Sequence, residues 1–140
     1  MKVAVVFWSS TGNTESMAEA IVEGAKGAGA EVELKNIPDF SADDVANYDV
    51  LAFGCPAMGD EVLEEDEVQP WFDGIKGALS GKKLALFGSY GWGDGEWMRN
   101  WEEDCKAAGA ELIAESLTCQ EEPDDDGVAS CKAFGAALNS

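Results

Sequence analysis

Ser9-Ser10-Thr11-Gly12-Asn13-Thr14 follows an apolar run, Val3 to Trp8, and precedes a helical pattern that begins at Glu15. Hydroxyl groups, one amide and the backbone N–H groups of a turn opened by Gly12 would converge on the helix N-terminus. Unpaired donors and the helix dipole favour an anion there. Residues 9–21 contain no Lys or Arg, whereas a triphosphate site normally carries a lysine after its last glycine. The stretch predicts either a holder for a bound phosphomonoester or a Ser/Thr-rich turn that only caps its helix.

The length and charge of the chain narrow the class of protein. Its 140 residues suit a single domain spanning 1–140. With 28 acidic and 9 basic side chains the net charge is -19, which argues against nucleic acid and anionic membrane as partners and favours basic protein surfaces. No apolar run approaches the roughly 20 residues of a membrane span, and no cleavage-like region follows Met1-Lys2. We therefore expect a cytoplasmic protein.

The four cysteines indicate neither a metal site nor a redox motif. Cys55, Cys105, Cys119 and Cys131 form no Cys-x-x-Cys pair, and the chain has no histidine. We expect reduced thiols with a structural role and no bound metal.

Apolar runs recur along the chain with helical patterns between them. The runs cover residues 2–8, 31–36, 50–54, 82–88 and 111–119. The first, third and fourth are apolar throughout, which is typical of central parallel strands covered on both faces. Five strands alternating with about five helices predict a doubly wound α/β fold.

In such a sheet a ligand binds beyond the carboxyl ends of the strands. The stretch at residues 9–14 leaves the first strand, Cys55 to Val62 leaves the third, and Ser89 to Glu96 leaves the fourth. Trp92 stands between two glycines in the last of these loops, where a bulky ring is unusual unless a flat ligand stacks on it. A phosphate site beside a stacking ring predicts a nucleotide-like aromatic cofactor.

Together the three loops resemble those of flavodoxins, the small FMN-binding electron carriers, and specifically the short-chain form. The most specific motifs are Ser9 to Thr14, the turn Met58-Gly59-Asp60-Glu61 and the loop from Ser89 to Gly95. The resemblance implies a five-stranded parallel sheet of order 2-1-3-4-5 with helices on both faces. It also implies that residues 9–14 bind the FMN phosphate, that Trp92 and Met58 cover the two faces of the flavin, and that Glu61 hydrogen-bonds its N3. The implied cofactor-binding residues are Ser9, Ser10, Thr11, Gly12, Asn13, Thr14, Pro56, Ala57, Met58, Gly59, Asp60, Glu61, Ser89, Tyr90, Gly91, Trp92 and Gly93.

The function implied by the resemblance is electron transfer rather than enzymatic catalysis. A flavodoxin of this kind is a monomeric, low-potential one-electron carrier that uses the semiquinone/hydroquinone couple of FMN. Its partners would be ferredoxin-linked oxidoreductases and other redox proteins with basic docking surfaces. Two acidic runs, residues 60–67 and 121–126, fit either a docking rim or an ordinary solvated face.

Two other functions are compatible with this topology. A receiver domain needs carboxylates after the first strand, where this chain has Phe7-Trp8-Ser9. An FMN-dependent NAD(P)H:quinone reductase would need a second site for the nicotinamide, and the sequence shows no basic pocket for a dinucleotide. The reductase remains as the alternative function.

Overall fold

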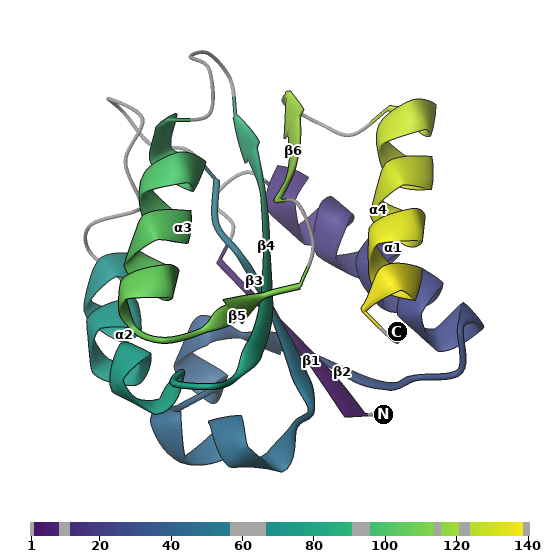
Figure 1. Ribbon diagram of the computed structural model, residues 1–140. Coiled ribbons are helices and arrows are strands. Elements are labelled where there is room, and N and C mark those ends of the chain that lie inside the picture. The colour runs from purple at the N-terminus through teal and green to yellow at the C-terminus, as the bar shows by residue number, and fades with distance from the viewer. Residues whose placement is uncertain are drawn as a thin grey trace.

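The computed structural model describes residues 2–8, 12–56, 67–90, 96–113, 116–120 and 124–138. A parallel sheet crosses the molecule (Figure 1). Its strands are β1 (Lys2–Phe7), β2 (Glu31–Asn36), β3 (Val50–Gly54), β4 (Lys83–Tyr90), β5 (Glu111–Leu112) and β6 (Leu117–Gln120). The order is β2-β1-β3-β4-β5, and β6 also pairs with β4. The predicted parallel sheet and its strand order are confirmed.

The fifth position of the sheet is filled by two short strands instead of one continuous strand over 111–119. Leu84 of β4 pairs with Leu112, and Phe87 pairs with Leu117. Between these pairs β4 advances three residues (84 to 87) while the partner chain advances five (112 to 117). With two extra residues, the partner chain cannot keep continuous register with β4. The pairing therefore stops after β5 and resumes at β6.

Helices cover both faces of the sheet, with α2 and α3 on one side and α1 and α4 on the other (Figure 1). The bounds are α1 (Asn13–Gly27), α2 (Val68–Ile75), α3 (Glu96–Ala107) and α4 (Asp125–Ala137), with 3-10 turns η1 (Ile37–Asp39), η2 (Ala42–Asn47) and η3 (Lys76–Ala78). Within the described residues no helix combines the length and apolar composition that crossing a membrane requires.

Alternate residues of the central strands enter two different cores. In β1, Ala4 and Val6 pack on the α2 and α3 side, while Val3, Val5 and Phe7 pack on the α1 and α4 side. All five side chains are at most 4% exposed. Burial on both faces explains why these strands read as continuous apolar runs.

Two glycines bring α1 and α4 into backbone contact. A Cβ atom on Gly24 would lie 2.0 Å from the Lys132 carbonyl oxygen, and one on Gly135 would lie 2.0 Å from the Ile21 carbonyl oxygen. Only residues without a side chain fit at this distance. The helix that begins at the predicted phosphate site is therefore held directly against the last helix.

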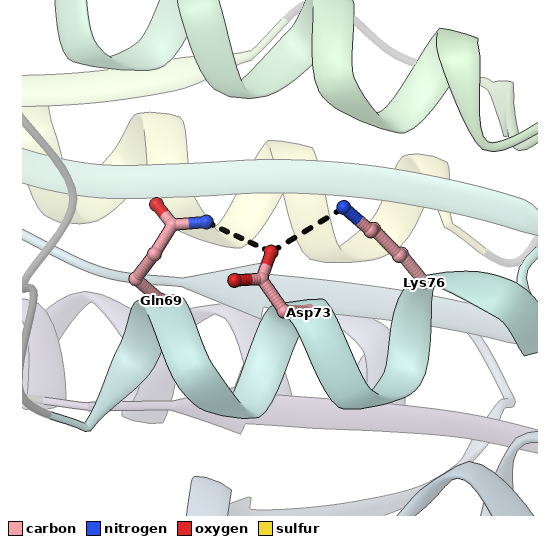
Figure 2. A network of polar contacts seen from close by, with 3 residues as sticks. All are labelled: Gln69, Asp73 and Lys76. Carbon is pink, nitrogen blue, oxygen red and sulfur yellow. Dashed lines mark hydrogen bonds and ion pairs between the residues drawn. The ribbon is translucent and has the colours of Figure 1, made fainter.

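The outer surface of α2 carries a small polar network (Figure 2). The Asp73 carboxylate accepts hydrogen bonds from Gln69 Nε2 at 3.1 Å and from Lys76 Nζ at 3.4 Å. Both charged side chains are about half exposed, so the ion pair contributes little to stability. It links α2 to η3 on the solvent side, away from the site.

Candidate functional site

The N-terminus of α1 forms the described part of the predicted phosphate loop. Gly12 adopts φ 91°, the left-handed conformation that glycine favours, and the helix begins at Asn13, two residues earlier than predicted. The Ser16 N–H and hydroxyl both donate to the Gly12 carbonyl, at 2.9 and 3.0 Å. Because this is the first bond of the helix, the N–H groups of residues 13–15 cannot pair within it and are directed out of its end. That geometry suits an anion.

A buried pair of hydroxyls joins this helix end to β4. Thr14 Oγ1 lies 3.2 Å from Ser89 Oγ, and the two residues are 0% and 4% exposed. They are the buried polar residues of the described chain. Burying two small hydroxyls beside a helix N-terminus is unfavourable unless their hydrogen-bonding capacity is used. The pair brings together residues that the sequence assigned to two different loops.

Ser89 and Tyr90 form the last two residues of β4, not the start of a loop as predicted. Successive strand residues point to opposite faces, so their side chains separate. Ser89 faces α1, whereas the Tyr90 ring lies 6.0 Å from the Trp97 ring and packs with the α2 and α3 core. The structure therefore joins Ser89, but not the Tyr90 side chain, to the hydroxyl pair.

The end of β3 is held very close to β4. The Cys55 N–H donates to the Phe87 carbonyl at 3.2 Å, and Trp97 Nε1 donates to the Cys55 carbonyl at 3.1 Å. A Cβ atom on Gly88 would lie 2.1 Å from that same Cys55 oxygen. Pro56, a predicted site residue, is buried at this junction. The helical spacing of Trp97 in the sequence carries no sign of this hydrogen bond.

The chain that follows residues 57–66 is attached to the end of β1. Trp8 is half-buried, and its Nε1 donates to Glu67 Oε2 at 2.5 Å. Glu67 belongs to the first acidic run, so at least one carboxylate of that run is hydrogen-bonded within the fold. Cys55 and Glu67 are thus each held to a neighbouring strand end, Cys55 to β4 and Glu67 to β1.

The arrangement fits the phosphate of FMN. It offers a buried, mutually hydrogen-bonded pair of hydroxyls and the N–H groups at the start of α1, beside a glycine in the left-handed conformation. Such hydroxyl and N–H groups can donate hydrogen bonds to phosphate oxygens. No cation is needed for such a site, in agreement with the lack of Lys and Arg in residues 9–21.

Comparison with known proteins gives a consistent result. A sequence model of the family described as Flavodoxin matches residues 5–135. The chain belongs to the flavodoxin family. It is 49% identical over 134 residues to a flavodoxin of Clostridium beijerinckii and 47% identical over 135 residues to a flavodoxin of Megasphaera elsdenii, with 96% of each chain covered.

Solved flavodoxin structures share the fold over the whole chain. The solution structure of the two-electron reduced Megasphaera elsdenii flavodoxin matches with a TM-score of 0.89 and 46% identity, covering 99% of both chains. Oxidised flavodoxin 1 of Bacillus cereus matches with a TM-score of 0.87 and 30% identity, covering 99% of this chain and 97% of the other. The protein is thus an FMN-binding electron carrier, as the sequence resemblance implied.

The structure places part of the predicted flavodoxin site. Among the predicted cofactor-binding residues it describes Gly12, Asn13, Thr14, Pro56, Ser89 and Tyr90. The others lie outside the described residues: Ser9, Ser10, Thr11, Ala57, Met58, Gly59, Asp60, Glu61, Gly91, Trp92 and Gly93. The described residues lie at the ends of β3 and β4 and the start of α1, which form one edge of the sheet (Figure 1).

Proposed function

We propose that this flavodoxin transfers single electrons between cytoplasmic redox proteins at low potential, with residues 9–14 and Ser89 holding the FMN phosphate. The observation that carries the proposal is the buried Thr14–Ser89 hydroxyl pair at the N-terminus of α1. The uncharged hydroxyls can donate hydrogen bonds to the phosphate without adding positive charge. The negative charge of the phosphate and of the acidic side chains is therefore not neutralised by this pair. Trp92 and Met58 are proposed to cover the flavin, and Glu61 to accept a hydrogen bond from its N3.

The distribution of basic residues supports the low potential. Residues 9–21, 55–75 and 84–98, which include the three loops at the carboxyl edge of the sheet and the chain beside them, contain no Lys or Arg. Lys2 and Lys83 begin β1 and β4, at the opposite edge. Within these segments, negative charge added at the carboxyl edge meets carboxylates and no Lys or Arg, although Arg99 follows the last of them in the first turn of α3.

Bound FMN supplies two successive one-electron steps. A carboxylate about 10 Å away opposes an added negative charge by roughly 0.4 kcal/mol in water, which salt screening reduces to about 0.15 kcal/mol. Ten such charges contribute about 1.5 kcal/mol, or on the order of 65 mV at roughly 59 mV per tenfold change. Surface charge thus accounts for a modest part of the low potential, and exclusion of water from the pocket is proposed to supply the rest.

The scarcity of Lys and Arg in the segments around the carboxyl edge also favours a partner with a basic surface. An acidic rim around the carboxyl edge would steer a basic redox protein towards the cofactor and make its association rate fall with salt. This favours docking through the first acidic run, residues 60–67. The proposed partners are ferredoxin-linked oxidoreductases and other carriers of basic surface.

The test is a stepwise reductive titration of the purified, FMN-loaded protein, followed by absorption. Two separate one-electron steps are expected, with the second well below the potential of free FMN and raised by added salt. A second step at the potential of free FMN at every salt concentration would contradict the low-potential assignment. Rapid bleaching by NAD(P)H without an added reductase would instead favour the quinone reductase.

Docking is tested separately by neutralising carboxylates in the first acidic run and, as a control, at the edge where the strands begin. Glu64→Gln with Glu65→Gln should slow electron transfer from a ferredoxin-linked oxidoreductase at low salt, without moving either potential. Glu31→Gln with Glu111→Gln is the matched control, because both glutamates are exposed and begin strands at the opposite edge. Equal slowing by the two pairs of substitutions would show that the electron-transfer rate depends on net charge alone, and would contradict docking through the first acidic run.

A further inference from the structure

Trp97, in the first turn of α3, contacts the ends of two neighbouring strands. Its Nε1 donates a hydrogen bond at 3.1 Å to the carbonyl oxygen of Cys55, the residue that follows β3. The centre of its ring lies 6.0 Å from that of Tyr90, the last residue of β4. Trp97 and Cys55 are 1% and 0% exposed. Trp97 therefore joins the two strand ends inside the core, on the α2 and α3 side of the sheet.

The backbone of β4 leaves room for this contact. A Cβ atom on Gly88 would lie 2.1 Å from the Cys55 carbonyl oxygen and 3.1 Å from Cζ2 of Trp97. A side chain at this position would displace the acceptor and the donor ring. The Cys55 N–H also donates to the Phe87 carbonyl at 3.2 Å. Both backbone polar groups of Cys55 thus hold the end of β3 against its neighbours.

A second tryptophan of α3 lacks this hydrogen bond. Trp101 is also 1% exposed and belongs to the same core cluster. Its ring packs edge-on against Phe72, with the ring centres 6.0 Å apart. Its Nε1 has no hydrogen-bond partner within the described residues, so packing must offset the cost of burying that N–H. The two tryptophans share a helix and a core, and they differ in the bond that Trp97 makes to the backbone of Cys55.

We propose that Trp97 is a positioning residue for the flavin ring, because it fixes the spacing of the ends of β3 and β4. The inference rests on the function proposed above, in which Met58 and Trp92 cover the flavin. Met58 comes three residues after Cys55 in the sequence. Trp92 comes two residues after Tyr90, so both proposed covers continue from the strand ends that are joined. Because the bond is buried, the low local dielectric strengthens it, and its loss should weaken the contacts with the ring and admit water.

The first measurement compares two variants by titrating each apoprotein with FMN and with riboflavin. Trp97→Phe keeps an aromatic ring and removes the N–H donor. It should weaken the binding of both ligands alike, by about two- to tenfold, the range for loss of one neutral hydrogen bond. Trp101→Phe is the matched control, because it removes a buried N–H that makes no such bond. It should change either affinity by less than about twofold.

The second measurement separates positioning from fold stability. In a reductive titration of FMN-loaded Trp97→Phe, the second one-electron step should move towards the potential of free FMN. The same two- to tenfold change corresponds to roughly 20 to 60 mV, at about 59 mV per tenfold. The cause is that water reaching the ring stabilises the added negative charge. A residue that only packs would lower the urea midpoint and leave both potentials unchanged, as expected for Trp101→Phe.

Three results would overturn the proposal. One is a Trp97→Phe variant with unchanged flavin affinities and potentials. Another is an equal loss in Trp101→Phe. The third is a loss confined to FMN, which would place the effect at the phosphate. If Trp97→Phe fails to fold, benzothienylalanine at position 97 replaces it in each measurement, because that residue keeps the bicyclic shape without the N–H. Failure of the proposed function would differ, since the wild-type protein itself would then show no second step below free FMN.

Discussion

Replacing Thr14 by valine tests whether the buried hydroxyl pair binds the cofactor phosphate. The change removes the hydroxyl that lies 3.2 Å from Ser89 Oγ and leaves a side chain of similar shape in a position that is 0% exposed. A hydrogen bond to a charged acceptor contributes about 1.5 to 3 kcal/mol. At roughly 1.4 kcal/mol per tenfold, the affinity for FMN should fall about 10- to 100-fold.

The assay is titration of apoprotein with FMN and with riboflavin, followed by quenching of flavin fluorescence. Riboflavin has no phosphate, so its affinity should change less than about threefold, the effect of a few tenths of a kcal/mol of altered packing. Thr14→Ser keeps the hydroxyl and should restore most of the FMN affinity. An equal loss for both ligands would refute the reasoning, because Thr14 would then act only through packing.

Two further predictions concern stability. Gly24→Ala places a methyl group 2.0 Å from the Lys132 carbonyl oxygen, so α1 and α4 must separate and the free energy of unfolding should fall by about 1 to 3 kcal/mol. Gly74→Ala is the control: its methyl group would have no atom within 4 Å, and the free energy of unfolding should rise by about 0.5 to 1 kcal/mol. Equal effects of the two variants in urea unfolding would contradict the close approach of the helices. Burial, followed by the hydrogen bond to Glu33, raises the pKa of Tyr48 from 10.0 to about 12. The folded protein then holds this proton more tightly than the unfolded chain, so wild-type stability should fall as the pH rises from 10 to about 12. If the urea midpoint of a Tyr48→Phe variant declined equally over this pH range, Tyr48 would not be the cause.

The elements of the fold could be predicted because their signals are local. Runs such as Val3 to Phe7 are apolar at every position since both faces of the strand are buried, and this is visible without any partner. The glycine before α1 and the hydroxyl-rich stretch at residues 9–14 likewise mark a strand-to-helix turn by their own chemistry. The break between β5 and β6 is different, because it arises from a length mismatch with β4 that no local pattern reveals.

By itself the sequence determined the α/β alternation, the loops that meet at the carboxyl edge, and the family, with its FMN. Only the tertiary structure decided which side chains meet there. Thr14 reaches Ser89 across 75 residues and Trp8 reaches Glu67 across 59, while the Tyr90 side chain lies on the opposite face of the sheet, against Trp97. Contacts of this kind depend on strand register and helix packing, which are properties of the assembled sheet and leave no periodic trace in the chain.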